Sequence, residues 1–137
     1  MNKNLQIFLA ILAGIITSCL VGLILFPALK WVIIKNLHLF EQSSVQNKLA
    51  INGAGFLWIG ISSCCGGYIA ALLVPYKNIF CSLVTGVTGF VLVLCVAFYQ
   101  QTGFSLIGLL SGFEVIIFSL IGGIIQQKIA LKKYEAI

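Results

Sequence analysis

Four long stretches of apolar residues, joined by short polar segments, dominate the pattern of the chain. They cover about residues 5–26, 53–74, 79–99 and 104–125. Each approaches the roughly 20 apolar residues that an α-helix needs to cross the hydrocarbon core of a bilayer. The pattern therefore predicts an all-α integral membrane protein, an antiparallel four-transmembrane-helix bundle.

Polar residues mark the segments between and after these stretches. Pro27 is expected to end the first span, because proline removes a backbone donor and disrupts a helix. Residues 30–52 are expected to form an interfacial and polar loop. Its first part, residues 31–40, is loosely amphipathic as a helix, with Trp31 at the level of the lipid headgroups. Residues 126–137 are expected to form an exit helix or a cytoplasmic tail. Residues 1–137 are thus predicted to be a single membrane domain.

The composition agrees with this interpretation and narrows the possible partners. Hydrophobic residues make up 61% of the chain and charged residues 8%, whereas a soluble domain carries about 25% charged residues. The net charge of +5 comes from lysines, because the chain contains no arginine. No basic face is interleaved with aromatic residues, so nucleic acid is not an expected partner. The positive charge indicates anchoring at the surface of a lipid bilayer.

The distribution of the lysines predicts the orientation of the spans. Four spans place both termini on one side of the membrane, and that side carries more lysines than the other. The positive-inside rule then predicts cytoplasmic termini. The usage of lysine, asparagine and isoleucine without arginine indicates an AT-rich bacterial genome. The residues on the terminal side are Lys3, Lys77, Lys128, Lys132 and Lys133, and those on the other side are Lys30, Lys35 and Lys48.

Small residues recur every four positions along the spans, a pattern that lets membrane helices approach closely. The second span carries two adjacent stripes of this kind, so we expect it to lie inside the bundle against two neighbours. The small residues predicted to make helix contacts are Ala10, Gly14, Ser18, Gly22, Gly66, Gly67, Gly108, Gly112 and Gly123.

All the cysteines lie within apolar stretches, and none has the spacing of a redox or metal motif. They are expected to pack as small apolar residues, and no metal or cofactor is predicted. Residues 16–19 also resemble a bacterial lipobox, in which Cys19 would be lipidated after cleavage. The chain stays apolar as far as Phe26, which favours an uncleaved span.

Glu114 lies near the centre of the fourth apolar stretch, where a carboxylate costs about 2.5–3.5 kcal/mol on insertion scales. No span contains a lysine or arginine that could pair with it, and burial disfavours a charged carboxyl group. We therefore predict a protonated Glu114, hydrogen-bonded to a hydroxyl group such as that of Ser111. Tyr68 offers a further hydroxyl in the second span. The alternative is a site coupled to a proton or a cation.

At about 100° per residue, Gly108, Gly112 and Gly123 lie nearly opposite Glu114, whereas Gly122 lies nearer to it. If the glycines packed within one chain, Glu114 would tend to face lipid, which is costly. Either Glu114 or the glycines would then be covered by a partner. This argument predicts a homo-oligomer or association with another membrane protein.

The few polar residues do not form a catalytic arrangement. The chain has one histidine, His38, and no aspartate, and its three glutamates lie on different segments. The protein is therefore not expected to be an enzyme. We expect an accessory or assembly subunit, or a self-associating module. The alternative is a small transporter or channel subunit coupled through Glu114.

Two short glycine motifs carry a resemblance to a known group of proteins. The second span contains Gly-Gly-Tyr-x-Ala-Ala within residues 58–75, and Gly122 and Gly123 mark the last span. These motifs resemble those of small, four-span bacterial inner-membrane proteins without assigned activity. The small multidrug transporters are similar in size and span number and carry an essential glutamate in the first span. The first span here has no acidic residue, which argues against drug export.

Overall fold

The computed structural model describes residues 2–37, 45–99 and 106–135, and this part of the chain is helical almost throughout. The helices are α1 (Lys3–Leu37), α2 (Val45–Leu73), α3 (Asn78–Tyr99) and α4 (Leu106–Glu135), with a short 3₁₀ turn, η1 (Pro75–Lys77), between α2 and α3. Each α-helix contains a stretch long and apolar enough to cross a membrane. The prediction of four apolar, potentially spanning helices is confirmed.

The first helix does not end at Pro27, where the sequence predicts the end of the first span. It continues to Leu37, although its apolar, span-like stretch ends at Ala28. A proline inside a helix leaves one carbonyl group without its usual partner. No glycine or second proline follows within α1, so the next residues resume the helix.

Most of the expected loop between residues 30 and 52 is also helical. The end of α1 occupies its first part and the start of α2, from Val45, its last part. Residues 38–44, which include His38 and Glu41, lie outside the described residues. The expected tail is likewise a continuation of α4 as far as Glu135. Gln, Lys, Leu and Ala are frequent in these extensions, and all four residue types favour helices.

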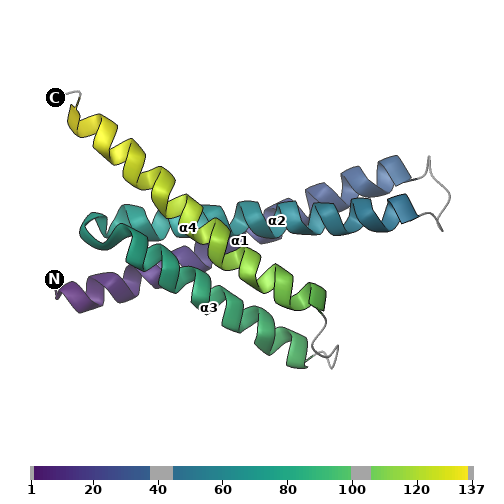
Figure 1. Cartoon of the computed structure of the whole chain (residues 1–137), viewed down its shortest axis with the longest axis horizontal. Coiled ribbons are helices and arrows are strands. Elements are labelled where there is room, and N and C mark those ends of the chain that lie inside the picture. Colours follow the sequence, from purple (N-terminus) through teal and green to yellow (C-terminus); the bar gives the residue numbers. More distant parts are fainter. Residues whose placement is uncertain (1, 38–44, 100–105, 136–137) are drawn as a thin grey trace.

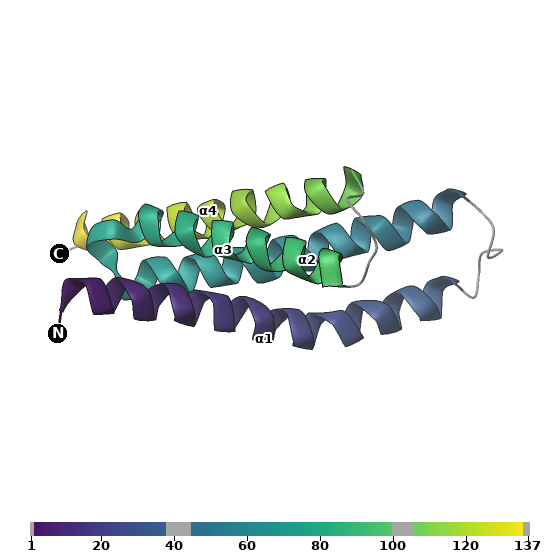
Figure 2. The ribbon, with the colours of Figure 1, turned by 90° about the horizontal axis from the view of Figure 1, so that it is seen from below.

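The helices form two pairs that cross each other. In Figure 1, α1 and α2 run side by side, and α3 and α4 are inclined across them. In Figure 2, α1 and α4 lie on opposite sides, with α2 and α3 between them. The N-terminus, the η1 turn and the C-terminus lie at the same end of the molecule. Helix α2 contacts all three other helices.

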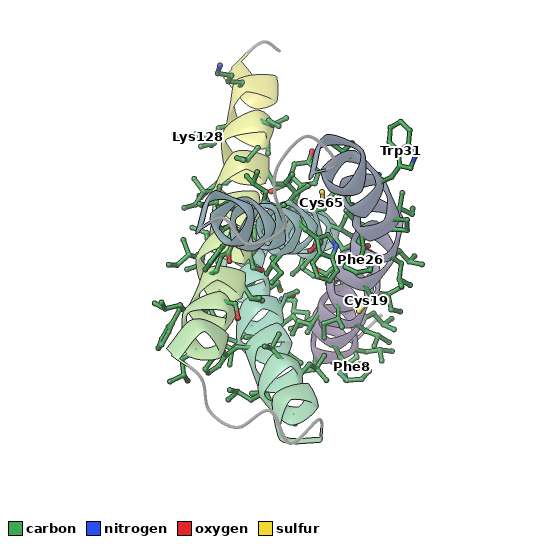
Figure 3. The ribbon with its side chains drawn as sticks, turned by 90° about the vertical axis from the view of Figure 1, so that its right-hand side faces the viewer. Phe8, Cys19, Phe26, Trp31, Cys65 and Lys128 are labelled. Atoms are coloured by element: carbon green, nitrogen blue, oxygen red, sulfur yellow. The ribbon has the colours of Figure 1, made fainter. Side chains whose placement is uncertain are left out.

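Small residues lie inside the molecule and large apolar residues lie outside. Ala10, Ala70, Val74 and Cys81 form a fully buried cluster. By contrast, large aliphatic and aromatic side chains cover the outer faces of the helices. In Figure 3, the Trp31 side chain projects outward from the helices. This distribution suits a surface in contact with lipid, where close helix contacts rest on small residues.

Candidate functional site

The backbones of α1 and α2 touch at two glycines. A Cβ atom on Gly14 would lie 2.8 Å from the carbonyl oxygen of Gly66. One turn farther along α1, the Ser18 hydroxyl donates a hydrogen bond of 3.1 Å to the carbonyl of Ser62. The small residues of the first span therefore face α2.

The next glycine along α2 faces a different helix. A Cβ atom on Gly67 would overlap the carbonyl oxygen of Ser119 in α4, and one on Gly122 would overlap the carbonyl oxygen of Cys64. Adjacent residues on α2 thus permit close approach of α1 on one side and of α4 on the other. The structure places α2 inside the bundle.

Helices α2, α3 and α4 are joined by a short chain of hydroxyl groups. Ser119 Oγ donates to the carbonyl of Ser82 at 2.7 Å, and Ser82 Oγ lies 2.9 Å from the carbonyl oxygens of Gly67 and Asn78. A Cβ atom on Gly123 would overlap the Ser82 hydroxyl. Glycine makes room here for hydroxyl groups that bond to backbone carbonyls of neighbouring helices.

Glu114 is enclosed between α4 and α2. Its side chain is 8% exposed, and a Cβ atom on Gly60 would lie 3.1 Å from Glu114 Oε1 and 3.1 Å from the ring of Phe118. Glu114 Oε2 is fully buried and makes no hydrogen bond within the described part of the chain. The missing side chain at Gly60 therefore provides the space that the carboxyl group occupies.

Both faces of α4 are covered by this chain itself. Glu114 faces α2, whereas Gly112 lies against Phe90 and Gly123 against Ser82, both of α3. The expectation that a partner must cover one of these faces is wrong, because the crossing of the helix pairs puts α2 and α3 on different flanks of α4. Association with a second copy or with a partner protein stays a prediction, but the angles on α4 no longer support it.

The other two predicted site residues lie apart from each other. Ser111 is half-buried in α4, one turn before Glu114. Tyr68 is half-buried where α2 meets Gly122. It lies eight residues beyond Gly60, or about 12 Å along α2, so it is not brought to Glu114. For Gly108, the structure describes its place in α4 but not its surroundings.

A cavity of about 420 Å³ lies between α1 and α3, with α2 and α4 forming its floor. On α1 its lining begins at Ile15, next to the point where Gly14 meets the Thr85 side chain. Beyond this contact every helix contributes small residues to the lining, such as Ser18, Ser63, Gly89 and Ser119. Its volume is within the range of about 300–1,000 Å³ that is usual for small-molecule sites.

Trp58 of α2 lies at the far end of this cavity. Its Nε1–H donates a hydrogen bond of 2.7 Å to the carbonyl of Gly22, and its ring packs against Phe26 at a centroid distance of 5.0 Å. Cys19, labelled in Figure 3, is an exposed residue of α1 that also lines the cavity. Among the residues that the structure describes, the lining contains no charged side chain, and Glu114 does not contribute to it.

Sequence reasoning found only some of the polar residues in this lining. Of these residues, the sequence singled out Ser18 as a helix-contact residue, and it also lines the cavity. Trp58 and Ser119 were missed as lining residues, because only the crossing of the helices brings them to the same space.

Comparison with protein-family models, with curated proteins and with solved structures gave no match for this chain. Within the described ranges, no three histidine, cysteine, aspartate or glutamate residues are grouped as a metal site would require.

Infrared spectroscopy should show a protonated carboxyl group that belongs to Glu114. The described lysine side chains are exposed. None of them therefore lies beside the enclosed carboxyl group of Glu114. We expect the C=O stretch of a carboxylic acid at neutral pH, lost in Glu114→Gln and kept in Glu135→Gln. The stability of Glu114→Gln should differ from wild type by about 1 kcal/mol or less, because a neutral group replaces a neutral group. A wild-type spectrum that shows only carboxylate would contradict this prediction.

Proposed function

We propose that the protein is a non-enzymatic accessory protein of the bacterial inner membrane. It forms an antiparallel four-span bundle with cytoplasmic termini and binds another component of the membrane. Four apolar helices and outward-facing large side chains support insertion in a bilayer. The exposed Lys77 and Lys128, which belong to the helix ends on the terminal side, support the orientation.

The cavity between α1 and α3 is the observation that carries the binding role. Its rim includes Leu23, which is 70% exposed, and Leu92, which is 46% exposed. Both belong to the outer apolar surface that would face lipid. The cavity therefore opens sideways into the hydrocarbon region, where a membrane component can enter without crossing water.

The lining favours binding over catalysis. It offers hydroxyl groups, an indole and the thiol of Cys19, but no acidic or basic side chain that could activate them. Transport coupled through Glu114 is not favoured either, because the carboxyl group faces Gly60 while the neighbouring Val115 faces the cavity. Coupled transport would need a polar path between the Glu114 carboxyl group and the cavity.

Native mass spectrometry of the tagged protein, extracted from its own membranes in mild detergent, tests this proposal. We expect wild type to carry an additional component, protein or small molecule, in fixed stoichiometry. Val93→Phe fills the cavity from its lining and should lose that component. The control Val91→Phe adds the same volume at an exposed position of the same helix and should keep it. A component that persists in Val93→Phe, or no component in wild type, would contradict the proposal.

A further inference from the structure

Ser63 differs from the other hydroxyl-bearing residues of the cavity. It lies on α2, lines the cavity and is 5% exposed. Its hydroxyl makes no hydrogen bond to the residues that the structure describes. The others donate to backbone carbonyls, as the Ser62 hydroxyl does to Ile59 at 3.0 Å and the Thr85 hydroxyl to Cys81 at 2.8 Å.

The position of Ser63 makes this free hydroxyl informative. The apolar stretch of α2 runs over Gly53–Leu73, and Ser63 is its middle residue. At that depth no bulk water is present to accept a hydrogen bond. Within the described lining, Ser63 is the hydroxyl whose hydrogen is not already donated to a backbone carbonyl.

The remainder of the lining limits the chemistry of an occupant. Its described residues include no charged side chain to compensate a charged ligand. Along α1 it extends from Ile15 to Leu23, a distance of about 12 Å for eight residues. The space is therefore elongated along the helices and apolar, with one hydrogen-bond donor on its floor.

We propose that this cavity binds an uncharged, lipid-soluble small molecule with an apolar chain and one hydrogen-bond-accepting oxygen. The chain lies between α1 and α3, and the oxygen accepts the hydrogen of the Ser63 hydroxyl. This inference rests on the proposed binding role of the cavity and names the class of its ligand. The molecule enters from the bilayer past Leu23 and Leu92.

The fluorescence of Trp58, at one end of the cavity, reports on occupancy. The chain has two tryptophans, so Trp31→Phe leaves Trp58 as the only one. Purified full-length protein in detergent is titrated with a long-chain methyl ketone and with the straight-chain alkane of the same length. We expect saturable changes in Trp58 emission, with the ketone binding about tenfold more tightly than the alkane, as one hydrogen bond provides.

Variants at Ser63 test the hydrogen bond itself. Ser63→Ala should bind the ketone no better than the alkane, whereas Ser63→Thr keeps the hydroxyl and should keep the preference. Thr88→Val is the matched control, because the Thr88 hydroxyl bonds to the carbonyl of Val84 and does not line the cavity. The preference should be unchanged in this variant.

Two results would overturn the inference and leave the proposed function standing. One is equal binding of ketone and alkane by wild type and Ser63→Ala, with both blocked by Val93→Phe. The other is a native mass spectrum in which the component lost from Val93→Phe is a protein. Absence of any saturable change with either probe would also overturn the inference.

Discussion

A single methyl group added at Gly67 is expected to separate α2 from α4 and to destabilise the protein strongly. The Cβ atom of alanine would overlap the backbone carbonyl of Ser119, which cannot rotate away as a side chain could. Overpacking of this kind usually costs about 1–3 kcal/mol, and a backbone obstacle places Gly67→Ala at the upper end. Unfolding of the purified protein in mixed micelles measures the change.

Gly55→Ala provides the control for this variant. Gly55 lies on the same helix, and a Cβ atom there would meet nothing within 4 Å. Because alanine favours helix over glycine by about 0.5–1 kcal/mol, this variant should be at least as stable as wild type. Equal stability of Gly67→Ala and Gly55→Ala would show that α2 and α4 do not touch at this point.

Removal of the Trp58 side chain is expected to be the second large effect. The indole joins α2 to α1 through its hydrogen bond to the Gly22 carbonyl and its contact with Phe26. Truncation of a large aromatic residue to alanine costs about 3–5 kcal/mol in a packed site. Because Trp58 also lines the cavity, Trp58→Ala should lower both thermal stability and ligand retention.

Two further variants separate the contributions of Trp58. Trp58→Phe keeps an aromatic ring and should cost about 1 kcal/mol for the lost hydrogen bond. Trp31→Ala removes a tryptophan that is 64% exposed and should have a much smaller effect than Trp58→Ala. Similar losses for Trp58→Ala and Trp31→Ala would contradict the contact between Trp58 and α1.

The apolar helices were predictable because a bilayer requires a fixed length of apolar helix, which the sequence pattern shows directly. Their ends were less predictable. Pro27 is a strong local signal, yet α1 continues past it, because no glycine or second proline follows within the helix. The start of α2 at Val45 and the end of α4 at Glu135 also lie beyond the predicted spans.

Angles on an isolated helix show which residues share a face, but they do not say which helix covers that face. Gly66 and Gly67 are neighbours in sequence, yet one meets α1 and the other meets α4. In the same way, Glu114 and Gly112 both face helices of this chain, which an angle alone could not distinguish from contact with a partner. The missing information is the crossing of the two helix pairs.

The cavity was the least predictable feature, because it depends on where four helices do not meet. Small residues usually indicate close packing, as Gly14 does against Gly66. Gly89 and Gly22 also make close contacts, with Val115 and with Trp58 respectively, and yet both line the cavity. Whether a small residue closes a contact or leaves a cavity depends on the divergence of α1 and α3 beyond Thr85.

Quenching of Trp58 by brominated acyl chains tests most directly whether this cavity opens to the bilayer. The Trp31→Phe protein is reconstituted into bilayers of brominated lipid, alone and combined with Val93→Phe or Val91→Phe. We predict strong quenching of Trp58, reduced when Val93→Phe fills the cavity and unchanged by Val91→Phe on the outer surface. Equal quenching in all three proteins would contradict a laterally open cavity between α1 and α3.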